Sequence, residues 1–239
     1  MSEVRGEYTR ETYPSFGKKY NGEKAIISLT SWKARINTVS KTLYSLIQQC
    51  PGFHIVLVLS EEEFPKMCEE LPENLMLFVE NEMIELLWIY RNYKSFKKVL
   101  FTMDKYRDVP VISADDDCIY TCNYAQELYD KWLENKSFCI SMSNSFGSGF
   151  GILFPTFLDF KPYLNKVFQR TFNDDLFYKT FNDDLFYKTL CGKIKIKIWY
   201  LHTREHCCKN SVIFSNSIRP LNTKLNNYRD NKIIKSAIK

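Results

Sequence analysis

Three consecutive aspartates, Asp115, Asp116 and Asp117, are the residues whose type and spacing most clearly indicate chemistry. Adjacent negative charges repel, more strongly as the surroundings become less aqueous, so a cation should compensate them. Asp115 and Asp117 are one residue apart, so both could turn toward one ligand, one to a hydroxyl and one to a hard cation. Magnesium or manganese suits oxygen-only ligation and binds substrate phosphates. The alternative is a plain acidic turn, and pairing with neighbouring arginines, with no cavity beside them, would count against a metal site.

Apolar runs and amphipathic segments alternate along the part of the chain that must position these aspartates. Runs typical of buried strands cover residues 25–30, 53–59, 84–90, 109–113 and 138–142, and a glycine-rich turn at 146–154 leads into another. Apolar residues recur at helical spacing in residues 39–48, 61–70, 96–106 and 124–134. This alternation predicts an α/β fold with a mostly parallel, doubly wound sheet and a less regular C-terminal part. Ligands of such sheets bind beyond the carboxyl ends of the strands, where the aspartates fall.

The second half of the chain contains a perfect tandem repeat. TFNDDLFYK occupies residues 171–179 and again residues 180–188. The unit is far too short for a solenoid, and its nine residues would lengthen a helix by about two and a half turns. We expect the second copy to lead into a helix end at Gly192 and a strand at 194–199.

The composition is typical of a folded protein with one large domain, or one domain and a small appendage. Of 239 residues, 45% are hydrophobic and 26% charged. The eight cysteines fall in apparent core elements as often as in loops, which favours reduced thiols. The opening segment, MSEVRGEYTRETYP, is charged where a signal peptide is apolar, and no stretch approaches the roughly 18 apolar residues that cross a bilayer. We therefore expect a cytoplasmic protein.

Basic residues are concentrated in the C-terminal tail, although the net charge is only +5. From Leu201 onward, Glu205 and Asp230 are the acidic residues against Arg204, Lys209, Arg219, Lys224, Arg229, Lys232, Lys235 and Lys239. Such a tail is either a solvated terminus or a contact to an anionic partner such as lipid. We expect no nucleic-acid partner.

Four motifs in this order resemble GT-A glycosyltransferases: ISLTSWKARI, KSFKK, SADDDCIY and GSGFGILFP. The sequence is similar to bacterial and viral enzymes with an SLTSxxARI opening and an ADDDxxY metal motif of the DXD type, over about residues 25–201. The resemblance implies a Rossmann-like GT-A domain at 1–203, with a nucleotide-binding half at about 25–122 and an acceptor-side half at 123–203, before the tail at 204–239. It also implies a nucleoside-diphosphate sugar donor, Mn²⁺ or Mg²⁺, and hexosyltransferase-like transfer to an acceptor hydroxyl.

The resemblance assigns roles to five residues around the first and third motifs. Thr30 and Arg35 would border the nucleotide base. Asp115 would bind the ribose and lie at the metal, and Asp117 would ligate the metal. Asp116 would contact the donor sugar or the ribose.

The second motif contributes a basic pair, Lys97 and Lys98, where a lysine near the donor would bring a point charge to phosphate. Adjacent helical residues point about 100 degrees apart, so the two cannot approach the site equally. We favour Lys98, and a solvated position is the alternative for the other lysine. For either lysine, an ordinary surface position is the alternative.

The general base that an inverting transfer needs is expected in the repeat. In the resembling enzymes, an acidic pair at a helix start after the glycine-rich strand takes this role. Asp183 and Asp184 fit that description, and Asp174 and Asp175 have the same neighbours. We favour Asp184, because the second copy leads directly into the expected helix end; helix capping is the alternative role for these residues.

A late histidine, His202, could give the metal a nitrogen ligand, as in several GT-A enzymes, or be an ordinary residue at a strand end. Together with His206, Cys207 and Cys208 it could instead suggest zinc. That run lacks paired C-x-x-C spacing and would crowd its ligands, which argues against zinc.

The sequence therefore predicts a metal-dependent glycosyltransferase of surface glycan or polysaccharide synthesis. Its acceptor would be a glycan or lipid-linked glycan, and its tail would contact the inner membrane leaflet. A sugar nucleotidyltransferase of the same fold is the nearest alternative, but it would need a glycine-rich first loop, and SWKARI has no glycine. A catalytically inactive glycan-binding or scaffold protein is the other. The sugar, the acceptor, the linkage, the anomeric outcome and the oligomeric state are left open.

Overall fold

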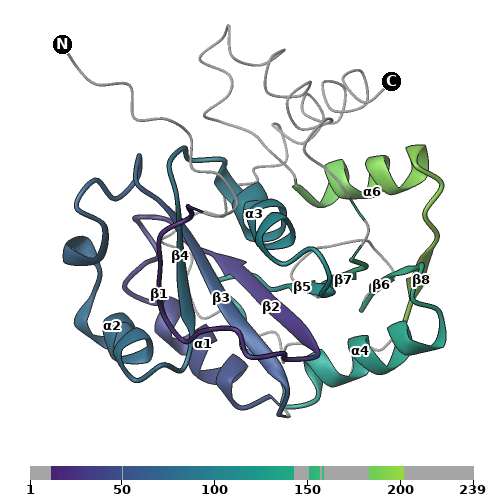
Figure 1. Cartoon of the computed structure of the whole chain (residues 1–239), viewed down its shortest axis with the longest axis horizontal. Coiled ribbons are helices and arrows are strands. Elements are labelled where there is room, and N and C mark those ends of the chain that lie inside the picture. Colours follow the sequence, from purple (N-terminus) through teal and green to yellow (C-terminus); the bar gives the residue numbers. More distant parts are fainter. Residues whose placement is uncertain (1–11, 50, 143–150, 157, 159–182, 202–239) are drawn as a thin grey trace, which may run out of the picture.

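A computed structural model describes residues 12–49, 51–142, 151–156, 158 and 183–201 of the chain. In this part an eight-stranded sheet lies between two layers of helices (Figure 1). The strands are β1 (Ser15–Gly17), β2 (Ala25–Thr30), β3 (Phe53–Ser60), β4 (Glu85–Ile89), β5 (Val111–Ser113), β6 (Cys139–Ser141), β7 (Ile152–Phe154) and β8 (Ile198–Tyr200). The helices are α1 (Val39–Ile47), α2 (Glu73–Glu80), α3 (Lys97–Lys105), α4 (Tyr124–Glu134) and α6 (Asp183–Lys193), with 3-10 turns at Met67–Glu70 and Lys94–Phe96.

The sheet has the order β1-β4-β3-β2-β5-β7-β6-β8. Strands β4, β3, β2 and β5 run parallel to one another, and β8 is parallel to β6. Strand β1 is antiparallel to β4, and β7 is antiparallel to both β5 and β6. The predicted α/β class with a mixed, mostly parallel sheet is confirmed.

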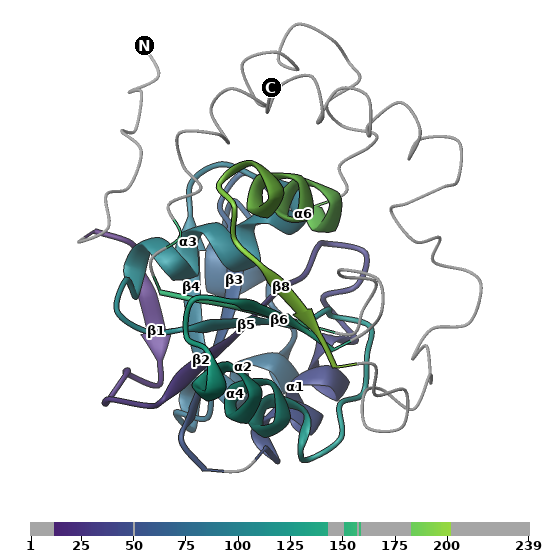
Figure 2. The same cartoon turned by 90° about the vertical axis from the view of Figure 1, so that its right-hand side faces the viewer.

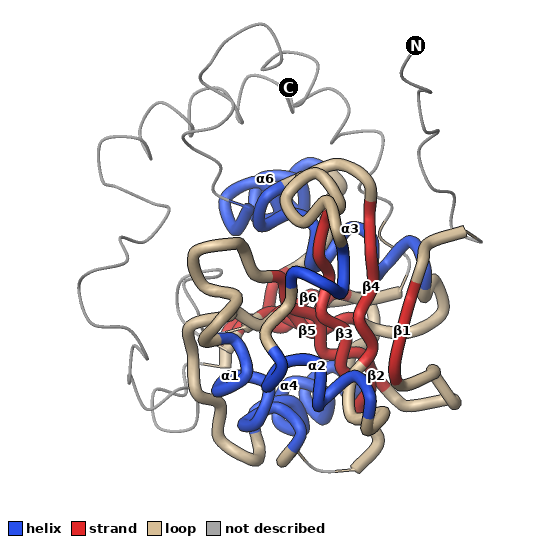
Figure 3. The backbone as a smooth tube through the Cα atoms, turned by 90° about the vertical axis from the view of Figure 1, so that its left-hand side faces the viewer, coloured by secondary structure: helices blue, strands red, loops and turns tan. Residues whose placement is uncertain are grey.

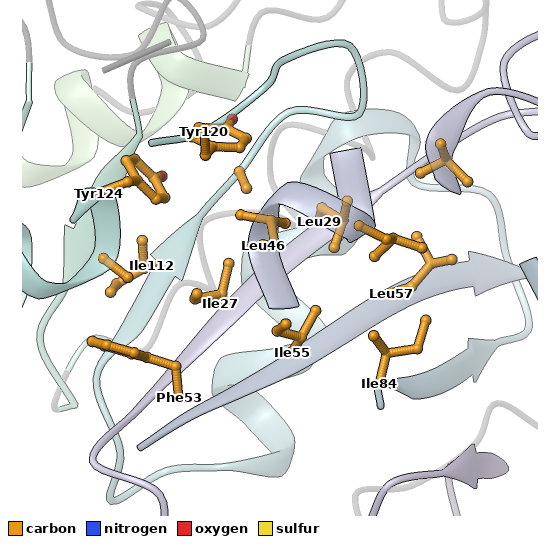
Figure 4. Close-up of a cluster of buried hydrophobic side chains, with 14 of the residues drawn as sticks. Ile27, Leu29, Leu46, Phe53, Ile55, Leu57, Ile84, Ile112, Tyr120 and Tyr124 are labelled. Carbon is orange, nitrogen blue, oxygen red and sulfur yellow. The ribbon is translucent and has the colours of Figure 1, made fainter. Parts of the chain in front are cut away.

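The two faces of the sheet are covered by different helices, which Figures 2 and 3 show from opposite sides. Helices α1, α2 and α4 cover one face and form a core with alternate residues of the strands, such as Ile55 and Leu57 of β3 (Figure 4). Helices α3 and α6 cover the other face, where Val56 and Val58 of the same strand are buried. A strand buried on both faces needs an unbroken apolar run, which is why residues 53–59 stand out in the sequence.

The helix predicted at 61–70 is wrong. Pro65 lies in its middle, and proline disfavours helical geometry in the residue before it and removes a backbone donor. The chain forms turns there, in which Glu63 and Phe64 donate their amides to the carbonyl of Ser60. Helix α2 follows instead, with Pro72 immediately before it and Leu75 buried on its inner side.

The edge strand β1 was not predicted, because its three residues carry no apolar alternation. None of the helices within the described ranges is long and apolar enough to cross a membrane. All the cysteines placed in these ranges are free thiols.

The four parallel strands end at one edge of the sheet, at Thr30, Ser60, Ile89 and Ser113. Helix α3 begins at this same edge, because it connects β4 to β5 and runs back across the sheet. The loops after these strands and the first turn of α3 therefore surround the aspartates.

Candidate active site

The loop that carries the aspartates is held rigidly where β5 ends. The backbone amide of Asp115 donates to the hydroxyl of Tyr120 at 2.7 Å, and the hydroxyl of Tyr124 donates to the carbonyl of Ser113 at 2.6 Å. The two tyrosine rings lie 4.3 Å apart between centroids. Figure 4 shows the Tyr124 ring near Ile112 of β5, with the Tyr120 ring next to it. The backbone is therefore hydrogen-bonded at Ser113, the last residue of β5, and at Asp115, the first of the three aspartates.

Asp115 faces the first turn of α3. Its Oδ1 accepts a hydrogen bond from Lys98 Nζ at 2.7 Å, and its side chain is 33% exposed. The carbonyl of Lys98 accepts a bond from the hydroxyl of Ser28 in β2, which ties the start of the helix to the sheet. The structure thus brings Lys98, the lysine favoured from the sequence, to the aspartate loop.

Asp116 is buried, whereas Asp115 and Asp117 are partly exposed. Asp116 Oδ1 accepts a bond from Arg35 Nη1 at 2.8 Å, and its Oδ2 accepts one from the hydroxyl of Ser31 at 2.6 Å. Burial raises the pKa of Asp116, and the bonds from Arg35 and Ser31 oppose that rise. Thr42 of α1 also donates to the Asp116 carbonyl at 3.0 Å. Each side-chain oxygen thus has a partner within the protein, and Asp116 is only 7% exposed, which leaves little room for the predicted contact with donor sugar or ribose.

Arg35 connects Asp116 to Asp117. The same Nη1 lies 2.8 Å from Asp117 Oδ2, and the Asp117 side chain is 27% exposed. Burial alone would lower the pKa of Arg35, but the charges of Asp116 and Asp117 raise it above its usual value. Pairing with a neighbouring arginine is the arrangement that counts against a metal site, and a cation at Asp117 would have to compete with it.

Asp115 and Asp117 nevertheless suit a hard divalent cation in part. Both are partly exposed, and the second oxygen of Asp117 meets the weakly donating Cys118 thiol at 3.8 Å. Within the described ranges no group of three or more His, Cys, Asp or Glu residues is placed to hold a metal. Two carboxylates fit Mg²⁺ or Mn²⁺, which keep waters and take substrate phosphates as further ligands.

Lys97, the other lysine of the pair, is buried at 1% exposure. Its Nζ donates to Asn92 Oδ1 at 3.0 Å and to Glu63 Oε2 at 3.2 Å. Burial lowers the pKa of Lys97, and the charge of Glu63 opposes that shift. A solvated surface position, the alternative for either lysine, is therefore ruled out, since Lys98 is buried as well.

Glu63 and Asn92 were not identified from the sequence. Glu63 also accepts the backbone amide of Lys33 at 3.1 Å, so with Lys97 it joins the loops after β2, β3 and β4 to the start of α3. The signal that could have revealed them is their position just beyond two apolar strands. Thr30, at the end of β2, donates its hydroxyl to the Val58 carbonyl at 2.6 Å, and its predicted place beside the base stays a prediction.

Asp183 and Asp184, the favoured base candidates, lie in the first turn of α6. The structure describes the backbone there and not these side chains, so their distance from Asp115 is left open. Asp174, Asp175 and His202 lie outside the described residues. The role of a base in the repeat therefore stays a prediction.

Helix α6 uses the second copy of the repeat, and the burial of the residues after that copy gives the reason. Residues Leu190 and Cys191 follow this copy and are fully buried. If the first copy took the same place in the helix, Phe181 and Asn182 would occupy their positions. Burying the amide of Asn182 where the thiol of Cys191 lies would cost free energy unless new hydrogen bonds formed.

Comparisons with known proteins identify no family for this chain. No protein-family model matches it, and no curated protein matches it. Two solved structures of the glycosyltransferase GlyE from Streptococcus pneumoniae TIGR4 align with TM-scores of 0.45 and identities of 14% and 15%. They cover 74% and 75% of this chain, which spans 45% and 46% of theirs. The mannosyltransferase PcManGT from Pyrobaculum calidifontis, in complex with GDP-Man and Mn²⁺, aligns with a TM-score of 0.49 and 12% identity, over 82% of this chain and 60% of its own. Similarity at this level transfers no function to the chain.

Proposed function

We propose that this chain is a metal-dependent glycosyltransferase that moves a sugar from a nucleoside-diphosphate sugar to an acceptor hydroxyl. The observation that carries the proposal is the aspartate loop at the carboxyl end of β5, where Asp115 and Asp117 are partly exposed and flanked by the cationic groups of Lys98 and Arg35. Opposite charges gathered at this edge of a parallel sheet suit a ligand that brings a metal and phosphates together. The motif order, which resembles GT-A enzymes, supports the same reading.

The described residues would divide the work of binding the donor. Asp115 and Asp117 would hold Mn²⁺ or Mg²⁺, which when bound supplies the charge that neutralises a leaving diphosphate. Lys98 and Arg35 would direct N–H donors at phosphate oxygens. By resemblance, Thr30 borders the base and Asp115 the ribose.

The roles of general base and additional metal ligand fall on residues whose side chains the structure does not describe. The contacts of Asp116, in contrast, change the role that we assign to it. Asp184 or Asp183 would accept the proton of the acceptor hydroxyl, with Asp175 or Asp174 as the copies, and His202 would add a metal ligand. The burial of Asp116 and its bonds to Arg35 and Ser31 favour a role in anchoring Arg35 over a contact with the donor.

The broader assignments rest on the sequence. We propose a domain at 1–203 followed by a basic tail, an acceptor that is a glycan or lipid-linked glycan, and a cytoplasmic location with peripheral contact of the tail to anionic lipid. The single sheet includes β5 of the proposed nucleotide-binding half and β7 of the proposed acceptor half as paired neighbours.

A glycan-binding protein without activity is the second candidate. It is favoured by the pairing of Arg35 with Asp117 and by the lack of a third acidic, histidine or cysteine ligand within the described ranges. An assay of donor hydrolysis distinguishes these two functions. With Mn²⁺ present, a binding protein leaves nucleotide sugars intact, whereas a transferase slowly releases nucleoside diphosphate from them.

The decisive test is donor binding with and without metal in Asp117→Asn. At a hundred-fold excess of donor over its Kd, the unaltered chain should gain about 2.7 kcal/mol, which raises the thermal midpoint by about 5–10 °C. Asp117→Asn should lose the Mn²⁺-dependent part of this rise, while its midpoint without ligand falls by only the about 2–4 °C that the exposed pair with Arg35 is worth. Asp108→Asn, an exposed carboxylate before β5 at the opposite edge of the sheet, is the matched control and should behave like the unaltered chain. Equal Mn²⁺-dependent stabilisation of Asp117→Asn would refute the proposal.

A further inference from the structure

One nitrogen atom of Arg35 forms two ion pairs that differ in their exposure to water. This atom, Nη1, lies 2.8 Å from Asp116 Oδ1 and 2.8 Å from Asp117 Oδ2. The Asp116 pair is buried on both sides, at 10% exposure for each side chain, whereas the Asp117 side chain is 27% exposed. Water screens the second pair more than the first, so the Asp117 bond is the weaker of the two.

The backbone of Arg35 is fixed close to the site. Its amide donates to the Trp32 carbonyl at 2.8 Å, and its carbonyl accepts the hydroxyl of Thr38 at 2.7 Å, in the turn that leads into α1. Asp116 in turn is held by Ser31 and, through its carbonyl, by Thr42. Arg35 could therefore give up Asp117 while its bond to Asp116 keeps the guanidinium in place.

We infer that Arg35 is the resident counter-ion of this site, which compensates Asp117 in the metal-free chain and yields that carboxylate to a divalent cation while staying anchored on Asp116. This inference rests on the proposed function, since it concerns the same metal. Two cations compete for one carboxylate, so Arg35 lowers the affinity of the chain for metal alone. After the exchange, the guanidinium N–H groups released by Asp117 would be available to the donor's diphosphate, and Arg–phosphate bonds would recover what was lost.

The test is the Kd for Mn²⁺ without any nucleotide sugar, from the electron paramagnetic resonance signal of free Mn²⁺. The double variant Arg35→Gln/Asp116→Asn removes both charges of the buried pair, so the net charge of the site is unchanged and neither partner is left buried without the other. If the exposed pair is worth about 1 kcal/mol, Mn²⁺ should bind about five-fold more tightly than to the unaltered chain. Adding Asp117→Asn to the double variant should abolish this gain.

Asp116→Asn alone provides a control that moves in the other direction. It removes the buried carboxylate that competes with Asp117 for the guanidinium, so Arg35 holds Asp117 more strongly and Mn²⁺ should bind more weakly than to the unaltered chain. A Mn²⁺ affinity of the double variant that is equal to or weaker than that of the unaltered chain would overturn the inference while metal binding stands. If neither chain depletes free Mn²⁺, the metal of the proposed function fails as well, which is a different result.

A second measurement uses the unaltered chain, in case the double variant does not unfold cooperatively. Mg²⁺ is titrated while the ¹⁵N–¹H signals of the Arg35 guanidinium, assigned by their loss in Arg35→Lys, are followed by NMR. We expect these signals to shift with the same midpoint as Mg²⁺ binding, because one of the two carboxylate partners is replaced. Signals that stay constant through saturation would overturn the inference.

Discussion

Gly151, the residue before β7, is predicted to control the end of β5 through Tyr124. Gly151 has φ of +78°, and a Cβ added there would lie 1.9 Å from the Tyr124 hydroxyl oxygen and 2.6 Å from two ring carbons. That hydroxyl donates to the carbonyl of Ser113, two residues before Asp115. Gly151→Ala must therefore move the tyrosine away from the strand end.

The cost of Gly151→Ala can be worked out from its parts. A side chain at positive φ costs about 1 kcal/mol. Displacing the Tyr124 hydroxyl leaves the Ser113 carbonyl without that buried bond, at about 1.5 kcal/mol or more. The substitution should lower the free energy of unfolding by about 2.5 kcal/mol or more in total, while Tyr124→Phe should cost about 1.5 kcal/mol.

Urea denaturation of the two single variants and the double variant is the assay. The hydroxyl is already absent in Tyr124→Phe, so adding Gly151→Ala should cost about 1–2 kcal/mol less than in the unaltered chain. The rescue is incomplete, because the ring carbons remain within 2.6 Å of the new Cβ. Additive effects of the two substitutions, or a loss below about 0.5 kcal/mol for Gly151→Ala, would refute the reasoning.

Two further predictions concern parts of the chain away from the aspartates. Burial alone would raise the pKa of Glu85, but bonds from His54, Lys105 and Tyr106 lower it in the folded chain. The Glu85 carboxylate therefore stabilises the fold above the unfolded pKa of about 4.3, and this stabilisation is lost as pH falls through the folded pKa. Glu85→Gln should lower the free energy of unfolding by about 3 kcal/mol at pH 7, and its thermal midpoint should fall less on acidification than that of the unaltered chain. A midpoint that falls with pH as steeply as in the unaltered chain would contradict this. Deleting residues 171–179 gives the same sequence as deleting the other copy, so α6 should still form. The thermal midpoint measured by calorimetry should stay within about 2 °C of that of the unaltered chain. Loss of cooperative unfolding would instead show that the fold needs both copies.

The central elements could be predicted from local pattern because each has a clear periodicity. The strand at residues 25–30 and the helix at residues 124–134 were predicted with the bounds that the structure has. The segment at 61–70 was misread because apolar residues at helical spacing were given more weight than Pro65. The edge strand β1 could not be found, since its three residues are defined by pairing with β4 and not by a pattern of their own.

At the candidate site, residue types were predicted more readily than their contacts. The aspartate loop and Lys98 were identified, and the structure brings them together at 2.7 Å through Asp115. The buried state of Lys97 depends on Glu63 and Asn92, which come from two other loops. No spacing in the sequence links these three residues, because the sheet alone makes them neighbours.

By itself the sequence determined the α/β class, the edge of the sheet at which the aspartates lie and the need for a compensating cation, because strand periodicity and like-charge repulsion are local properties. Only the tertiary structure decided which cation is present, since Arg35 reaches Asp116 and Asp117 from the loop after β2. Tertiary packing also decided the copy of the repeat that forms α6, because Leu190 and Cys191 must be buried. Such choices depend on which surfaces exclude water, and residues far apart in the chain create those surfaces.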